Sequence, residues 1–200
     1  MPDTGVGYFE SMYSANPDPW GFDSRWYERR KFELTLAALS QQRYRRAFEP
    51  GCANGALTTL LAERCDELIS CDFVESAITN AAARVRDLPN VTILNAHFPT
   101  FWPSGTGDLV VMSEVAYYLD DASAQVAVNG LERWLHPGGD IVSVHYIGET
   151  DYPRSGRSIS TWLDDVRFLQ RLTLLDDPQF QLGVWRRVID DDDRRRKCDK

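Results

Sequence analysis

The sequence lacks a long hydrophobic run, a cysteine pair at zinc-binding spacing and an excess of positive charge. Without an apolar stretch of about 20 residues we expect no membrane-spanning helix, and the amino terminus shows no signal-peptide pattern. The formal net charge of −8 argues against a nucleic-acid partner, because phosphate backbones are bound by basic surfaces. The four cysteines form no C-x-x-C pair, which predicts reduced thiols in a cytoplasmic protein without a metal site.

A strand, a glycine turn and a helix follow one another at residues 46–61, and this stretch is the most informative in the chain. Gly51 and Gly55 bracket the turn, where glycine permits positive φ and lets the backbone approach a ligand. The pattern is typical of the first half of a nucleotide-binding unit. A nicotinamide dinucleotide turn would place glycines at positions 53 and 56, and both are alanine. An ordinary surface turn is the competing interpretation of this stretch by itself.

An acidic residue ends the second predicted strand, which covers residues 67–73. Asp72 stands about 20 residues after Gly51, the spacing at which a carboxylate binds the two hydroxyls of a ribose. Phe73 follows, in a position suited to the edge of an adenine ring. The alternative role for Asp72 is that of N-cap for the helix predicted at 75–86.

Further strands are predicted at 90–96, 108–113 and 140–146, and helices separate them. Two more apolar runs, 169–175 and 180–188, predict a terminal hairpin. We therefore expect an α/β fold of the doubly wound, Rossmann-like kind. It would contain a seven-stranded, mostly parallel sheet with an antiparallel carboxyl-terminal hairpin and helices on both faces. A helix through Trp162, Val166 and Leu169 is expected before the hairpin.

The continuous apolar run at 108–113 is typical of a central strand, and the carboxyl ends of such strands border the ligand crevice. Glu114 and the pair Tyr117 and Tyr118 follow this run, so chemistry is expected there. One of the two tyrosines is expected to pack in the core. His145 ends the 140–146 strand and faces either the cleft or a core neighbour.

These stretches together resemble the class I S-adenosylmethionine-dependent methyltransferases, and within them the rhizobial nodulation methyltransferase (NodS) family. The resemblance covers nearly all of residues 8–188. Ala53 departs from the family pattern, in which the middle residue of the turn is most often glycine. The shared stretches are Asp18-Pro19-Trp20, Tyr27-Glu28, Glu49-Pro50-Gly51-Cys52-Ala53-Asn54-Gly55, Ser113-Glu114-Val115-Ala116-Tyr117-Tyr118-Leu119 and Pro137-Gly138-Gly139.

The resemblance implies S-adenosylmethionine as cofactor and direct transfer of its methyl group. Glu114 would serve as the base or orient the acceptor amine, with Tyr117 and His145 as further catalytic candidates. No acid follows the third strand to bind adenine, so Asn95 or His97 would replace it. His97 has no second ligand beside it, so it is not expected to bind metal. Cofactor binding is expected from Trp20, Glu49, Gly51, Ala53, Gly55, Asp72, Phe73, Asn95, His97 and Ser113.

The family N-methylates a deacetylated glucosamine of a chitooligosaccharide, so the resemblance implies an amino sugar or a related glycan amine as acceptor. Three alternatives stay open. The first is an O- or N-methyltransferase acting on a small natural product. The second is a nicotinamide oxidoreductase, against which the two alanines of the turn argue. The third is a methyltransferase-like scaffold that binds without catalysis. The chain is expected to be a monomer or a homodimer.

Three segments are expected. Residues 1–40 form a helical segment that could close over the cofactor as a lid, residues 41–189 form the methyltransferase domain, and the charge run at 190–200 is a disordered tail. Trp20 belongs either to the lid or to the packing of the sheet edge. Trp26 is expected to pack on that edge.

Overall fold

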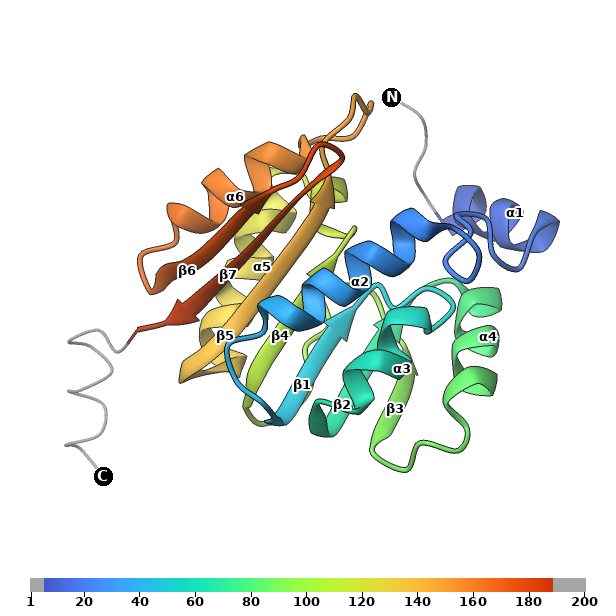
Figure 1. The fold of residues 1–200 in the computed structure, drawn as a ribbon, viewed down its shortest axis with the longest axis horizontal. Helices are drawn as coiled ribbons and strands as arrows, with labels where there is room; N and C mark the ends of the chain where they lie inside the picture. Colours follow the sequence, from blue (N-terminus) through green and yellow to red (C-terminus); the bar gives the residue numbers. More distant parts are fainter. Residues whose placement is uncertain (1–5, 189–200) are drawn as a thin grey trace.

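The computed structural model describes residues 6–188 and contains one seven-stranded sheet in the order β3-β2-β1-β4-β5-β7-β6 (Figure 1). Strands β1 to β5 are parallel, and β7 lies antiparallel between β5 and β6. The predicted fold class is therefore confirmed. The strands are β1 (Tyr44–Pro50), β2 (Cys65–Asp72), β3 (Val91–Asn95), β4 (Gly107–Ser113), β5 (Leu135–Tyr146), β6 (Leu169–Asp176) and β7 (Phe180–Arg187).

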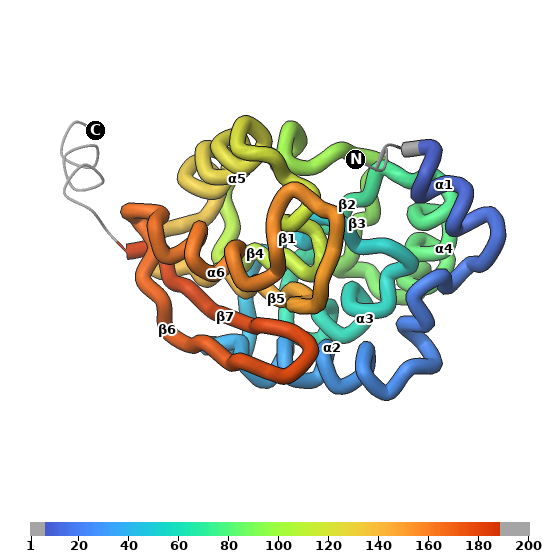
Figure 2. The backbone as a smooth tube through the Cα atoms, turned by 90° about the horizontal axis from the view of Figure 1, so that it is seen from above, coloured from blue at the N-terminus to red at the C-terminus, as the bar shows by residue number. Residues whose placement is uncertain are grey.

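Helices cover both faces of the sheet (Figures 1 and 2). One apolar cluster lies under α2 and α3, and a second lies under α5 and α6. The helix α1 packs on α4, beside the sheet. The helices are α1 (Val6–Ala15), α2 (Trp26–Ala38), α3 (Ala56–Ala62), α4 (Glu75–Val85), the short 3-10 helix η1 (Ala116–Tyr118), α5 (Asp121–Trp134) and α6 (Gly156–Asp164).

The central strand β4 shows why its sequence is apolar without a break. Successive side chains of a strand point to opposite faces. Leu109 and Val111 accordingly enter the cluster under α2 and α3, whereas Val110 and Met112 enter the cluster under α5 and α6. Both faces are covered over residues 109–112, so none of these four positions would let a polar side chain reach water.

Most element boundaries differ from the prediction by one or two residues, and two differ by more. Strand β5 begins at Leu135, directly after α5, because Leu135 already has an extended backbone and pairs with Gly107 of β4. Helix α6 ends at Asp164, so Val166 and Leu169 lie outside it. Both are buried, but they reach the core from the turn after α6 and from the first position of β6.

The two tryptophans near α2 have opposite environments. Trp26 is 67% exposed as the first residue of α2, so its predicted packing on the sheet is wrong. Trp20 is partly buried and contacts the rings of Phe9, Tyr13 and Phe22. The predicted tail at 190–200 lies outside the described residues. None of the helices within residues 6–188 is long and apolar enough to cross a membrane.

Candidate active site

A cavity of about 640 Å³ opens at the carboxyl edge of the parallel strands, where doubly wound sheets bind their ligands. Its floor is the turn after β1 together with the ends of β2 and β4. The amino-terminal segment forms the roof through Phe9, Tyr13 and Trp20. Of the candidate site residues, the cavity is lined by Trp20, Glu49, Gly51, Ala53, Asp72, Phe73, His97, Ser113, Glu114 and Tyr117.

The turn after β1 uses three left-handed residues, Gly51 (φ 72°), Ala53 (φ 51°) and Gly55 (φ 78°). A side chain on Gly55 would start 3.1 Å from the Cα atom of Ala81 in α4. Gly55 is therefore required by the close approach of the turn to α4, and it does not line the cavity. Ala53 adopts the conformation that favours glycine, although it carries a Cβ atom.

Asp72 joins the turn after β1 to the turn after β2. Its Oδ2 accepts a hydrogen bond from the Ala53 amide at 3.0 Å. Its Oδ1 accepts from the amides of Phe73 and Val74 at 2.8 and 3.0 Å. Burial raises the pKa of Asp72, and the three amides oppose that rise. A carboxylate has about four lone-pair sites, so Asp72 keeps acceptor capacity toward the cavity it lines.

The N-cap interpretation of Asp72 does not describe α4. The N-cap residue of α4 is Val74, and the first helical amide, that of Glu75, is bound by Glu10 of α1 at 2.8 Å. Glu10 also accepts a hydrogen bond from the Ser76 hydroxyl at 3.0 Å. The roof helix α1 thus supplies the side-chain cap of α4 through one carboxylate.

Glu49 is a buried acid at the end of β1, with 2% of its surface exposed. Its Oε2 accepts hydrogen bonds from the hydroxyls of Thr58 and Ser70, both at 2.7 Å. Burial raises the pKa of Glu49 to about 7, and the two hydroxyls oppose the rise. Both hydrogen bonds use Oε2, so Oε1 is the oxygen that remains available toward the cavity.

The two candidates for the adenine contact have different positions. His97 lines the cavity, and its ring centre lies 5.0 Å from that of Phe73, which also lines it. Asn95 is exposed, does not line the cavity, and donates a hydrogen bond to Glu75 at 2.7 Å. The structure therefore places Phe73 and His97 on the wall of the cavity that follows β2 and β3, whereas Asn95 lies outside the cavity.

Glu114 follows β4 with a left-handed backbone, φ 56°, which is rare for a residue with a side chain. Its Oε1 lies 2.8 Å from the Nζ atom of Lys31 in α2, and its Oε2 accepts a hydrogen bond from the Tyr146 amide at 3.1 Å. Burial would raise the pKa of Glu114, but the Lys31 ammonium, together with the electrostatic effect of His145 and the hydrogen bond from the Tyr146 amide, outweighs burial and lowers it. The cavity therefore contains an ionised carboxylate at neutral pH.

His145 does not line the cavity. It is 1% exposed, and its Nε2 accepts a hydrogen bond from the Ala116 amide at 3.0 Å. Because Nε2 accepts, Nδ1 carries the proton and donates it to the Ser143 hydroxyl, also at 3.0 Å. Burial lowers the pKa of His145 to about 4. The structure thus places this neutral imidazole beneath the turn that carries Glu114 and Tyr117, where it supports the backbone.

The sequence interpretation missed Lys31 as a site residue. Its signal is present in the sequence, because Glu28, Lys31, Phe32 and Thr35 share one helical face and all four are buried. Two charged residues on an inward face need partners, and partners inside a protein are often functional. Tyr152 was also missed: it lines the cavity and stacks on Tyr117, with ring centres 5.0 Å apart.

The sheet order and the cavity at its carboxyl edge define the class I methyltransferase fold. Within that class, residues 10–144 match the model of the family described as Nodulation protein S (NodS). This match covers more than half of the chain, so the chain belongs to the NodS family.

Curated relatives agree with this assignment. Nodulation protein S of Rhizobium tropici is 36% identical over 130 residues, which cover 64% of this chain and 55% of that protein. The protein of the same name from Sinorhizobium fredii is 35% identical over 130 residues, which cover 64% and 60%. The chain thus spans little more than half the length of these relatives.

Solved structures match over more of the chain. The crystal structure of the N-methyltransferase NodS from Bradyrhizobium japonicum WM9 in complex with S-adenosyl-L-homocysteine has a TM-score of 0.81 and 25% identity, over 91% of this chain and 98% of that one. A Pseudomonas syringae protein, provisionally assigned as a methyltransferase, has a TM-score of 0.73 and 40% identity, over 82% and 100%.

Proposed function

We propose that this protein is an S-adenosylmethionine-dependent N-methyltransferase. The observation that carries the proposal is the cavity, which brings the turn after β1, Asp72 and Glu114 to the carboxyl edge of the sheet. The related NodS of Bradyrhizobium japonicum binds S-adenosyl-L-homocysteine, the product expected of this reaction. When bound, S-adenosylmethionine supplies a methyl group that its sulfonium already activates.

The lining residues fit such a cofactor. Asp72 would accept hydrogen bonds from the ribose hydroxyls, and Phe73 with His97 would contact the adenine. Glu49, Gly51, Ala53 and Ser113 would surround the remaining part of the molecule. Residues 6–40 would act as a lid, because Phe9, Tyr13 and Trp20 already close the cavity from above. Closing the site would exclude water and align donor with acceptor, which is most of what an activated methyl group requires.

Glu114 would bind and orient the acceptor amine rather than remove its proton. A carboxylate with a lowered pKa is a weak base, but it is a strong partner for an ammonium or a polarised amine. His145 would hold the turn behind Glu114, since both ring nitrogens are used and the ring lies outside the cavity. Tyr117 would form part of the acceptor wall.

An amino sugar is the acceptor class that the cavity supports best. Tyr117, Tyr118 and Tyr152 form an aromatic wall beside Glu114, and the rim residue Thr150 also faces the cavity. Aromatic rings can pack against the apolar face of a sugar, while a carboxylate binds its amine. Another small amine would use Glu114 equally well, so a natural-product N-methyltransferase is the second candidate.

Calorimetric titration with S-adenosylhomocysteine tests the cofactor site. We expect micromolar binding, weakened at least about tenfold by Asp72→Ala, because hydrogen bonds to a charged group contribute about 1.5–3 kcal/mol. Asp87→Ala removes an acid whose side chain is 86% exposed and serves as the matched control. A folded protein that does not bind would favour a non-catalytic scaffold. Binding that survives Asp72→Ala would show that another group holds the ribose.

A comparison of two acceptors tests the substrate class. Methyl transfer to a glucosamine oligomer should exceed transfer to its N-acetylated counterpart by a large factor, because only the free amine carries a nucleophilic lone pair. Equal activity on both would indicate a hydroxyl acceptor. Activity on a small amine alone would favour the natural-product alternative.

A further inference from the structure

A lysine is buried between two carboxylates at the wall of the cavity. Lys31 is 1% exposed, and its Nζ atom lies 2.8 Å from Glu28 Oε2 and 2.8 Å from Glu114 Oε1. The same ammonium lies 4.8 Å from the ring centre of Tyr27. Glu28 and Lys31 belong to α2, whereas Glu114 belongs to the turn after β4. The contact therefore joins an amino-terminal helix to the centre of the site.

The two carboxylates are not equivalent. The side chain of Glu28 is 6% exposed, and burial raises its pKa although Lys31 is adjacent. The side chain of Glu114 is 20% exposed toward the cavity, and its pKa is lowered against the effect of burial. A buried charge is costly unless it is paired. Both carboxylates line the cavity, and the single ammonium mainly supports the ionised form of the more exposed one, Glu114.

The other ionisable groups around Glu114 do not replace Lys31. His145 of β5 is neutral near pH 7, because burial lowers its pKa to about 4. Burial also raises the pKa of the tyrosines that face this region, Tyr27 of α2 and Tyr117 and Tyr118 of η1, so all three are neutral. Within residues 6–188, Lys31 is the one cationic side chain in an ion pair with Glu114.

We propose that Lys31 is a positioning residue that keeps Glu114 ionised and aimed into the cavity, so that this end of the site selects a positively charged or polarised amine. The inference rests on the proposed function, in which the methyl group and its acceptor meet beside Glu114. Glu28 pairs with the lysine from the preceding turn of α2 and prevents an unpaired ammonium when Glu114 engages the acceptor.

Two cofactor analogues separate this inference from cofactor binding itself. S-Adenosylhomocysteine is uncharged at the position of the transferred methyl. Sinefungin carries a primary ammonium there and is otherwise closely similar. The ratio of their dissociation constants therefore reports the charge that the protein presents at the methyl-transfer end. It requires neither turnover nor a known acceptor.

For the parent protein we expect sinefungin to be preferred by a ratio that stays constant from pH 8 down to about pH 5.5. Lys31→Met should leave S-adenosylhomocysteine binding within about threefold of the parent value. It should reduce the sinefungin preference about tenfold at pH 6, the change that one pKa unit produces. Lys31→Arg, which keeps the charge, should retain the preference. Arg29→Met, on the exposed side of α2, is the matched control and should change neither value.

Lys31→Met leaves Glu28 and Glu114 without their cation, which destabilises the fold unless one carboxylate is also neutralised. Glu28→Gln combined with Lys31→Met provides that second variant, and it should lose the same preference. An unchanged sinefungin preference in either folded variant overturns the proposal. If neither folds, the parent profile decides: a preference that falls between pH 7 and 5.5 overturns it, and a constant one supports it. Absence of S-adenosylhomocysteine binding would instead contradict the proposed function.

Discussion

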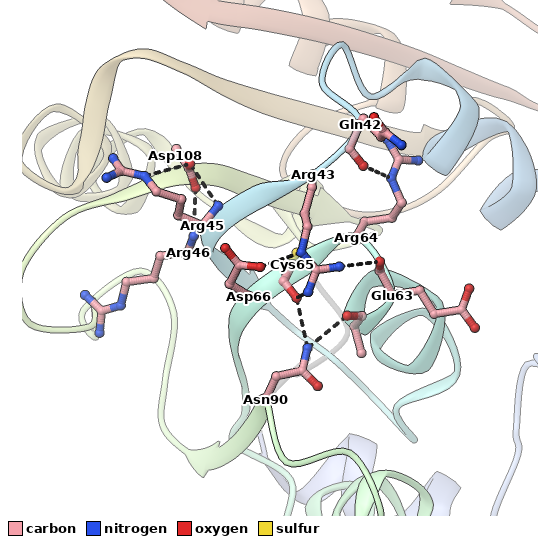
Figure 3. Close-up of polar contacts among 11 residues, drawn as sticks. Gln42, Arg43, Arg45, Arg46, Glu63, Arg64, Cys65, Asp66, Asn90 and Asp108 are labelled. Carbon is pink, nitrogen blue, oxygen red and sulfur yellow. Dashed lines mark hydrogen bonds and ion pairs between the residues drawn. The ribbon is translucent and has the colours of Figure 1, made fainter.

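The two edges of the parallel sheet use polar side chains in opposite ways. At the amino edge, arginine side chains donate hydrogen bonds to backbone carbonyl oxygens of neighbouring segments (Figure 3). Arg64 donates to the carbonyl oxygens of Leu36, Gln41 and Gln42. Arg43 donates to those of Glu63 and Cys65. The hydrogen bonds drawn there run between groups of the protein itself, and an exposed ion pair such as Arg43 with Asp66 contributes little to stability.

A small cavity of about 290 Å³ also opens at the amino edge, beside Arg45, Arg46 and Asp108. At the carboxyl edge, the polar groups line the cavity of about 640 Å³ instead. Asp72, Glu49 and Glu114 line it, two residues that carry side chains have left-handed backbones, and a lysine is buried behind the wall. Strained and buried ionisable groups accumulate at this edge because the site needs them there. The contrast indicates that changes at the amino edge should affect stability alone, and changes at the carboxyl edge should affect binding and chemistry.

The largest effect is expected from Glu114→Gln. Loss of the carboxylate that orients the amine should reduce kcat/KM for a glucosamine oligomer by about 10²-fold, the cost of misplacing a reacting group by about 1 Å. S-Adenosylhomocysteine affinity should change little, and calorimetry measures it in parallel. Glu149→Gln, an exposed acid of the rim loop, is the control. A tenfold loss or less would remove Glu114 from its proposed role.

Glu49→Gln should change how stability depends on pH. In the folded protein burial raises the pKa of Glu49 to about 7, so the folded state keeps a proton that the unfolded chain loses near pH 4.5. The carboxyl therefore destabilises the parent progressively from pH 4.5 to 7. As the pH rises from 4.5 to 7, the free energy of unfolding of the variant should increase by about 3 kcal/mol relative to that of the parent. Urea unfolding at several pH values measures this, with exposed Glu63→Gln as the control. A constant difference between variant and parent would contradict the prediction.

Arg64→Met tests the amino edge. Three carbonyl oxygens lose their donor, so we expect the free energy of unfolding to fall by about 2 kcal/mol. S-Adenosylhomocysteine affinity should stay within a factor of two, since Arg64 lies at the opposite edge from the cavity. Arg86→Met removes an arginine that is 77% exposed and should be nearly neutral. A large loss of affinity in Arg64→Met would break the division between the two edges.

The smallest effect is expected from Ala53→Gly. Its left-handed backbone (φ 51°) costs an alanine about 1 kcal/mol, which glycine would recover in part. Thermal unfolding should therefore show that Ala53→Gly raises the free energy of unfolding by up to about 1 kcal/mol. Ala82→Gly, in the exposed middle of α4, should lose about the same amount. If both variants were destabilised equally, the backbone of Ala53 would not be strained.

The sequence was sufficient for the fold because the relevant signals are local. The apolar run at 108–113 and the turn at Gly51 each depend on a few neighbouring residues. The environment of a side chain is not local. Lys31 and Glu114 are 83 positions apart and meet only because α2 packs on the face of the sheet, with its first turns beside the carboxyl edge (Figure 1). His145 ends its strand as predicted, but the burial that holds it outside the cavity depends on the turn above it.

The cap that α1 provides to α4 makes the two helices depend on each other. Glu10 binds both the Glu75 amide and the Ser76 hydroxyl, so α1 cannot lift from the cavity without leaving the first turn of α4 uncapped. Opening of the roof should therefore be visible as faster hydrogen exchange of the Glu75 amide. A ligand that closes the roof should slow that exchange. The exchange rate of the Glu75 amide proton would therefore report how often the site is open.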